Sequence, residues 1–180
     1  GDVEVDLRAV EGALARLEFV REAQRVERGL ERAFRAVPLR VVAETLDGLV
    51  RHYGLRGYLL INVPSETSTD FSSNVLLTSW PDDMLKTYDH AGLIFGSPVI
   101  ERLRQSTNPF TYDADRTNRP RIDGKAAIAA ALFERHGLPR GAYFPAHNSA
   151  GLRGALAFGG ARGDLDPREM AELNALANQI

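Results

Sequence analysis

A chain of 180 residues, 44% hydrophobic and 26% charged, has the size and composition of one globular domain with a sizeable core. Its formal net charge of −2 offers no basic footprint, so we expect it to bind neither DNA nor acidic lipid. The sequence has no cysteine, which excludes disulfides and cysteine-based zinc sites and agrees with a cytoplasmic location. No apolar run approaches the roughly 20 residues of a membrane helix.

The first elements predicted along the chain are two helices. Apolar side chains recur at steps of three and four, which predicts an amphipathic helix over about residues 6–36. Pro38 breaks this helix and suits the first turn of a second one, which we expect to end near Gly54. We therefore divide the chain into an N-terminal helical extension, residues 1–37, and a main domain, residues 38–180.

Two strands and two helix starts follow. Residues 58–63 and 74–79 form short runs rich in apolar residues, and the polar stretch between them is typical of a loop. Pro81 suits the start of a helix, and the two aspartates after it would stabilise the positive end of that helix. Ser97, which precedes a proline, is the expected N-cap of the next helix.

The next stretch is short and polar. Residues 110–112 predict a brief strand, and residues 113–123 are polar and basic, which indicates a loop. We interpret its basic residues as a solvated cluster, namely Arg116, Arg119, Arg121 and the nearby Lys125.

The last third of the chain predicts two helices and a hairpin. Residues 122–136 are Ala-rich and helical, and residues 142–147 and 154–158 read as strands joined by a hairpin loop. Asp166, with a glutamate three residues later, makes a capping-box start for a final helix. The whole order favours an α/β (α+β) fold, an α-β-α sandwich with a five-stranded, largely antiparallel sheet and helices on both faces.

An ordered set of motifs runs through the main domain. They are Trp80-Pro81-x-x-Met84-x-x-x-Tyr88, Ser97-Pro98-Val99, Pro109-Phe110-x-Tyr112, Tyr143-Phe144-Pro145-Ala146-His147 and Gly154-Ala155-Leu156-Ala157. Their order and spacing resemble the LuxR-type autoinducer-binding domain, the N-terminal half of quorum-sensing transcription regulators. The resemblance covers roughly residues 38–178.

This resemblance implies a PAS/GAF-like sandwich and a function. In the family, a cavity between the sheet and one helical layer holds an N-acyl homoserine lactone. Its occupancy controls folding, dimerisation and DNA binding by a C-terminal helix-turn-helix domain. No such domain is present in this chain, so we expect a homodimer that contacts DNA only through a domain absent here.

The resemblance also places a set of residues at the ligand: Trp80, Met84, Tyr88, Ser97, Val99, Phe110, Tyr112 and Ala157. Several depart from the family pattern. Met84 stands where the family has a tryptophan N–H donor, and Ser97 stands where it has an aspartate acceptor. Ala157 offers no polar group, and Trp80 replaces a tyrosine. We therefore expect a small, mostly apolar signal molecule rather than a standard acyl homoserine lactone.

Other interpretations stay open. The aromatic residues are equally typical of a core, Ser97 of a simple N-cap, and Met84 of core packing. The alternative function is a ligand-independent dimerisation or protein-interaction module with a filled, vestigial pocket. The sequence contains no G-x-S-x-G, H-E-x-x-H, phosphate-loop or Rossmann pattern, so we expect no enzyme activity and no cofactor. The four histidines are scattered, so we expect no metal site.

Overall fold

The computed structural model describes residues 38–147 and 151–179. The predicted helix of residues 6–36 and most of the predicted hairpin loop lie outside the described residues. The described chain forms a five-stranded sheet in the order β2-β1-β5-β4-β3, with every neighbouring pair antiparallel. The strands are β1 (Gly57–Asn62), β2 (Val75–Thr78), β3 (Phe110–Asp113), β4 (Arg140–His147) and β5 (Arg153–Gly160).

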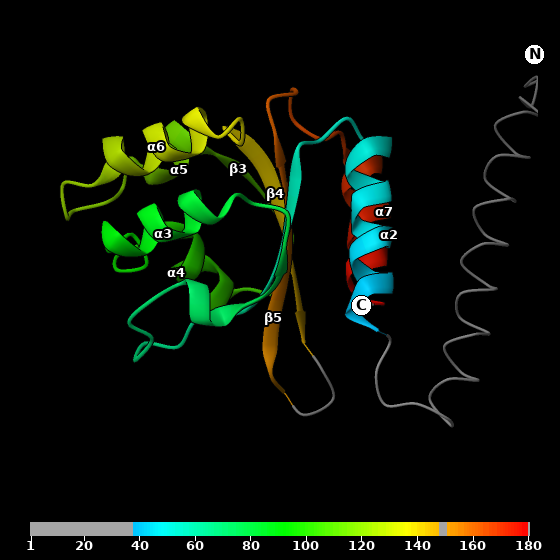
Figure 1. Ribbon diagram of the computed structural model, residues 1–180, viewed down its shortest axis with the longest axis horizontal. Coiled ribbons are helices and arrows are strands. Elements are labelled where there is room, and N and C mark those ends of the chain that lie inside the picture. The colour runs from blue at the N-terminus through cyan, green and yellow to red at the C-terminus, as the bar shows by residue number, and fades with distance from the viewer. Residues whose placement is uncertain (1–37, 148–150, 180) are drawn as a thin grey trace, which may run out of the picture. The chain divides into compact units, whose positions relative to one another are not determined.

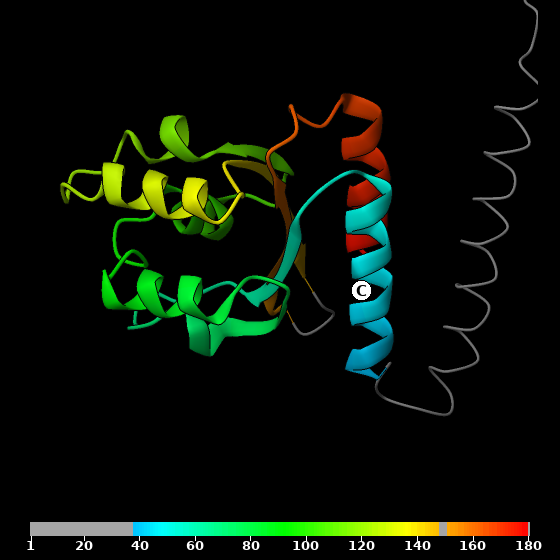
Figure 2. The ribbon, with the colours of Figure 1, turned by 45° about the horizontal axis from the view of Figure 1, so that its top comes forward.

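Helices cover both faces of this sheet, which makes the α-β-α sandwich (Figure 1). One layer consists of α2 (Leu39–His52) and α7 (Pro167–Ala177). The other layer consists of α3 (Asp82–His90), α4 (Pro98–Gln105), α5 (Ala114–Asn118) and α6 (Ala126–Arg135), and a 3-10 turn, η1 (Ser72–Asn74), precedes β2. Figure 2 shows the same two layers after rotation. No helix in the described part of the chain is long and apolar enough to cross a membrane.

The alternation of side chains along the strands creates two separate cores. In β4, Phe144 packs in the core under α2 and α7, whereas its neighbour Tyr143 packs in the core under α3, α4 and α6. In β5, Phe158 and Ala157 divide in the same way. The core on the α3–α6 side holds the larger set of aromatic residues, and it is the one that contains the candidate site.

Local sequence signals explain most of the boundaries. The Ser97 side chain accepts a hydrogen bond from the backbone N–H of Ile100 at 3.3 Å, so Ser97 is the N-cap of α4 as predicted. Asp166 and Glu169 form the predicted capping box at the start of α7. Pro145 is tolerated in β4 because the pairing with β3 ends at Tyr143, which leaves that part of β4 with a partner on one side only.

Three expectations for residues 113–136 are wrong. The predicted loop contains a short helix, α5, which begins because the Asp113 side chain accepts a hydrogen bond from the backbone N–H of Arg116. Arg121 is buried rather than solvated. The next helix begins at Ala126, and Ile122, which was expected within it, is fully exposed.

Candidate functional site

A small internal cavity lies between the sheet and the α3–α6 layer. Its volume is about 20 Å³. Its walls are the side chains of Ile61, Phe71, Trp80, Tyr88, Ser97, Val99, Ile100, Leu103, Tyr112, Asn118, Arg121, Phe133 and Tyr143. These side chains come from strands β1, β3 and β4, from helices α3, α4, α5 and α6, and from the segments next to those helices. The cavity is thus where elements distant in sequence meet.

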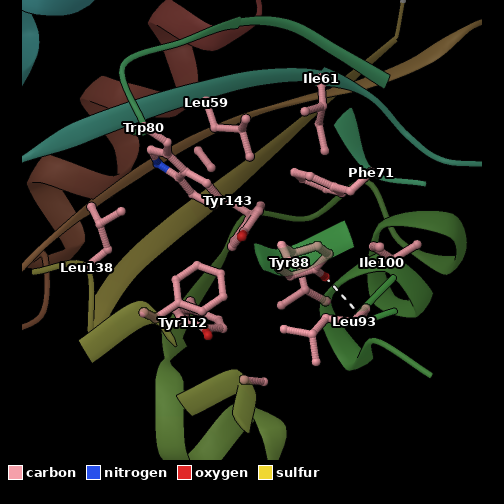
Figure 3. Packing of buried hydrophobic residues seen from close by; sticks show 14 of the residues in the cluster. Leu59, Ile61, Phe71, Trp80, Tyr88, Leu93, Ile100, Tyr112, Leu138 and Tyr143 are labelled. Carbon is pink, nitrogen blue, oxygen red and sulfur yellow. Dashed lines mark hydrogen bonds between the residues drawn. The ribbon is translucent and has the colours of Figure 1, made fainter. Parts of the chain in front are cut away.

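Aromatic rings form one wall of this cavity. Phe133, on α6, is their centre: its ring centroid lies 5.1 Å from that of Tyr112, 5.4 Å from that of Trp80 and 6.4 Å from that of Tyr88. Tyr143, on β4, lies 6.0 Å from Tyr112. Figure 3 shows Trp80, Tyr88, Tyr112 and Tyr143 facing a common space beside the sheet. Such a surface suits a flat or apolar molecule.

Part of the cavity lining is polar, and Arg121 is its charged residue. The Arg121 side chain is 1% exposed. Its Nη2 donates to the carbonyl oxygen of Leu93 at 2.7 Å, and its Nη1 donates to that of Phe95 at 3.1 Å. Its Nε donates to Asn118 Oδ1 at 3.0 Å. The guanidinium therefore joins the end of α5 to the turn between α3 and α4.

Three tyrosine hydroxyls border the same space. Tyr88 donates to the Leu93 carbonyl oxygen at 3.2 Å (Figure 3), and Tyr112 accepts from Asn118 Nδ2 at 3.0 Å. Burial raises the pKa of Tyr88, Tyr112 and Tyr143, because the phenolate would be desolvated. For Tyr88, the nearby Ser97 and Arg121 partly oppose that rise in pKa. All three hydroxyls are therefore neutral at physiological pH, and those of Tyr88 and Tyr112 are engaged in hydrogen bonds.

Two polar groups of this core lack partners within the described residues. The indole Nε1–H of Trp80 is buried and donates to no acceptor. The hydroxyl of Tyr143, whose side chain borders the cavity, forms no hydrogen bond in the same part of the chain. A buried polar group without a partner costs about 1–3 kcal/mol, so both groups are available to an incoming acceptor.

The structure brings together five of the eight residues that the sequence placed at a ligand: Trp80, Tyr88, Ser97, Val99 and Tyr112. The other three lie elsewhere in or beside the same core. Met84 is fully buried and packs in the core without lining the cavity. Phe110 stacks on Tyr143 at 5.3 Å between centroids, and Ala157 borders a second cavity of about 10 Å³ next to Trp80.

Sequence reasoning missed several cavity residues. Phe133 lies in the predicted Ala-rich helix, and its position on the apolar face could have marked it. Tyr143 lies on β4, in a motif that supports the family resemblance but does not by itself indicate a ligand contact. Asn118 and Arg121 lie in the predicted polar loop, Arg121 in its basic cluster, and no local pattern distinguishes them from their exposed neighbours. Tertiary packing alone identifies them as part of the site.

The chemistry of this arrangement is that of binding. Apolar and aromatic side chains border the cavity together with hydroxyl, amide and guanidinium groups, and among the described residues no aspartate or glutamate borders it. In residues 38–147 and 151–179, no group of three or more histidine, aspartate or glutamate side chains is placed to hold a metal ion. The cavity can therefore accept an apolar molecule that carries a hydrogen-bond acceptor.

Comparison of the sequence with known proteins identifies its family. The family model described as the autoinducer binding domain matches residues 39–180. The transcriptional activator protein BjaR1 of Bradyrhizobium diazoefficiens is 29% identical over 143 residues, which cover 77% of this chain and 57% of that protein. The chain thus spans a little over half the length of this curated relative.

Solved structures share the fold. SdiA in complex with octanoyl-rac-glycerol superposes with a TM-score of 0.61 at 15% identity, over 85% of this chain and 62% of that one. The LuxR family transcription factor CepR2 of Burkholderia cenocepacia gives 0.54 at 20% identity, over 74% and 77%. A GAF domain, GAF3 of Slr1393 from Synechocystis, gives 0.52 at 16% identity, over 78% and 89%. The sandwich is therefore GAF-like.

Proposed function

We propose that the protein senses a small, mostly apolar molecule in the cavity between the sheet and helices α3–α6. The chain belongs to the autoinducer-binding domain family of LuxR-type regulators, whose members are non-enzymatic signal receptors. The regulator acts in the cytoplasm, and DNA is bound through a domain outside this chain. The proposed site consists of Trp80, Tyr88, Ser97, Val99 and Tyr112 with Arg121, Asn118, Phe133 and Tyr143, and the other predicted residues, Met84, Phe110 and Ala157, lie beside it in the same core.

One observation carries this proposal: an aromatic cavity whose border includes hydrogen-bond donors without partners. The Trp80 indole N–H is buried and unsatisfied among the described residues, and the Tyr143 hydroxyl, on a buried residue that borders the cavity, forms no hydrogen bond there. Since buried polar groups in proteins are nearly always paired, a ligand acceptor that reached either group would recover about 1–3 kcal/mol. Donors without partners destabilise a core, so selection for stability alone would not retain them.

Two departures from the family pattern argue against a standard acyl homoserine lactone. Such a ligand needs an acceptor for its amide N–H and donors for its carbonyls. Ser97 already accepts the N–H of Ile100 as a helix cap, and no carboxylate borders the cavity. Met84 has no donor and lies outside the cavity wall. One or two unmet groups reduce affinity by about 10-fold to 10⁴-fold.

The cavity volume favours the second candidate function, a dimerisation module with a filled pocket. Small-molecule sites in proteins usually measure about 300–1,000 Å³, and this cavity measures about 20 Å³. A ligand of ordinary size therefore requires the α3–α6 layer or its aromatic side chains to move. Ligand binding and a filled pocket differ in whether that movement occurs in solution.

Native mass spectrometry of the protein purified from its own host tests the proposal directly. A retained small molecule of constant mass supports sensing. A protein that carries no small molecule and is nevertheless fully stable supports the filled pocket. A thermal-shift panel of lactones of varied chain length tests the ligand class. Nanomolar binding of any of them by the unaltered domain would contradict the argument from polar groups.

The matched variant for this panel is Ser97→Asp. Aspartate keeps the N-cap hydrogen bond to Ile100 and adds a charged acceptor at the cavity border. We expect it to increase lactone affinity over the parent. Met84→Trp is a poorer variant, because Met84 is fully buried and an indole would overpack the core.

We also propose that the protein is a homodimer in which the apolar stripe of residues 6–36 is buried. This segment lies outside the described residues, so the proposal rests on the sequence alone. A long amphipathic helix gains most of its stability from burying that stripe. Replacing Leu14 and Leu17 by Asp should halve the mass in light scattering or unfold the protein; an unchanged mass and melting temperature would contradict the proposal.

A further inference from the structure

Arg121 is the charged residue that borders the cavity. Arginine is rarely buried unless it is paired with a carboxylate in good geometry. Here the carboxylate partner is Asp123, whose Oδ2 accepts from Nη1 at 3.3 Å, the longest of the Arg121 hydrogen bonds. The contact uses one N–H, and the Asp123 side chain is 27% exposed and does not border the cavity. The charge of Arg121 is thus only partly compensated.

The guanidinium also makes one contact that a ligand could take over, its hydrogen bond with the Tyr88 hydroxyl. It carries five N–H groups. Four of them donate, to Leu93, Phe95, Asn118 and Asp123. One N–H of Nη2 has no acceptor in the backbone or a carboxylate, and the Arg121 side chain also hydrogen-bonds the Tyr88 hydroxyl, which a ligand acceptor would have to replace. A ligand acceptor in that place would find a charge-assisted donor.

The groups around Arg121 also favour an acceptor. The Ser97 hydroxyl accepts from Ile100 and hydrogen-bonds the Tyr88 hydroxyl, so its proton can turn to a ligand acceptor that displaces Tyr88. The Tyr143 hydroxyl has no partner in the described chain. Helix α4 begins beside the cavity, with Ser97, Val99 and Ile100 in its wall, and the positive end of a helix favours a negative charge. No acidic side chain is present there to receive an amide N–H or a cation.

We infer that Arg121 selects the ligand, and that the ligand is an apolar, preferably aromatic, monocarboxylic acid whose carboxylate is bound by Arg121 with Ser97 and Tyr143. The inference rests on the proposed ligand-binding function and specifies the polar head of the ligand. The hydrocarbon part lies against the ring of Phe133 and its aromatic neighbours. Charge-assisted hydrogen bonds are about twice as strong as neutral ones, which makes the carboxylate the distinguishing group.

The experiment compares three probes with one hydrocarbon skeleton: 3-phenylpropanoate, its methyl ester and its primary amide. Affinities are measured by calorimetry and thermal shift on the full 180-residue chain. We expect the carboxylate to bind about 10-fold to 100-fold more tightly than the ester or the amide. Arg121→Met should reduce that preference to within about 3-fold.

A second variant separates recognition from a purely structural role of Arg121. In Asp123→Asn, Oδ1 can still accept from the backbone N–H of Lys125, but the carboxylate that competes for the guanidinium is removed. We expect carboxylate affinity to rise, even if the melting temperature falls. If Arg121 only joins α5 to the turn at Leu93, stability falls and the preference among the probes does not change, which would overturn the inference.

The outcomes also separate this inference from the proposed function. Equal or tighter binding of the ester overturns the selection by Arg121 but leaves an apolar ligand site. Binding of none of the three probes at millimolar concentration overturns both. Binding of all three that survives Phe133→Ala unchanged places the probes outside the cavity and overturns both as well.

Discussion

Phe133 is the residue whose truncation should reveal most about this cavity. It is 6% exposed, borders both internal cavities and packs its ring against those of Trp80, Tyr88 and Tyr112. Phe133→Ala removes the ring from the centre of this cluster. Core truncations of this kind cost about 3–5 kcal/mol, including the loss of aromatic pairs worth roughly 0.5–1.5 kcal/mol each. For a domain of this size, the melting temperature should fall by about 10–20 °C.

The space left by the ring has a second consequence. This space is lined by apolar and aromatic side chains and adjoins the existing cavity. The two together should form a cavity large enough for a benzene ring. Apolar cavities engineered in protein cores stay dry and bind benzene. We therefore expect benzene or toluene to raise the melting temperature of Phe133→Ala by several degrees, following the mass-action relation between ligand concentration and stability.

Phe133→Leu is the matched control, because leucine fills most of the same space. It should cost less than about 1.5 kcal/mol and gain nothing from benzene. The assay is thermal unfolding followed by circular dichroism, with and without saturating benzene. The reasoning is refuted if Phe133→Ala has the same melting temperature as the parent protein, or if benzene raises the melting temperatures of both variants equally.

The further predictions concern the scaffold and DNA binding. Gly141→Ala should abolish cooperative unfolding, because its Cβ would lie 2.0 Å from the carbonyl oxygen of Phe158. Gly48 lies in α2 with open space around it, so Gly48→Ala should raise the free energy of unfolding by about 0.5–1 kcal/mol in urea titrations. The Arg162 hydrogen bond holds the pKa of Glu169 below its ordinary value of 4.5, so this carboxylate stabilises the fold at neutral pH and stops doing so as the pH falls through the lowered pKa. Glu169→Gln should therefore lower the urea midpoint at pH 7 and match the parent near about pH 2. The chain alone should not shift duplex DNA at submicromolar concentration in a gel at physiological salt, since its net charge is −2.

Local signals in the sequence were enough to predict most elements of the sandwich. A helix cap, a proline at a first turn or an alternating strand acts within a few residues, so its effect is visible without the fold. Ser97 at α4 and the Asp166–Glu169 pair at α7 are of this kind, and both are confirmed. The fold class and the family followed from the order and spacing of such signals.

The boundaries that failed are those where local signals are weak. Helix α5 has five residues, too few for an apolar periodicity, and its cap at Asp113 stands in a stretch dominated by charge. The helix predicted from residue 122 begins at Ala126, because the chain bends through Gly124, whose φ of 74° does not fit a helix.

The contents of the cavity depended on the tertiary structure. Arg119 and Arg121 are two residues apart in the same basic stretch, yet one is exposed and the other buried. The difference arises because the backbone carbonyls of Leu93 and Phe95, almost thirty residues earlier, meet Arg121 and not its neighbour. Burial of a charge is decided by partners that are distant in sequence, and only the folded chain brings those partners to it.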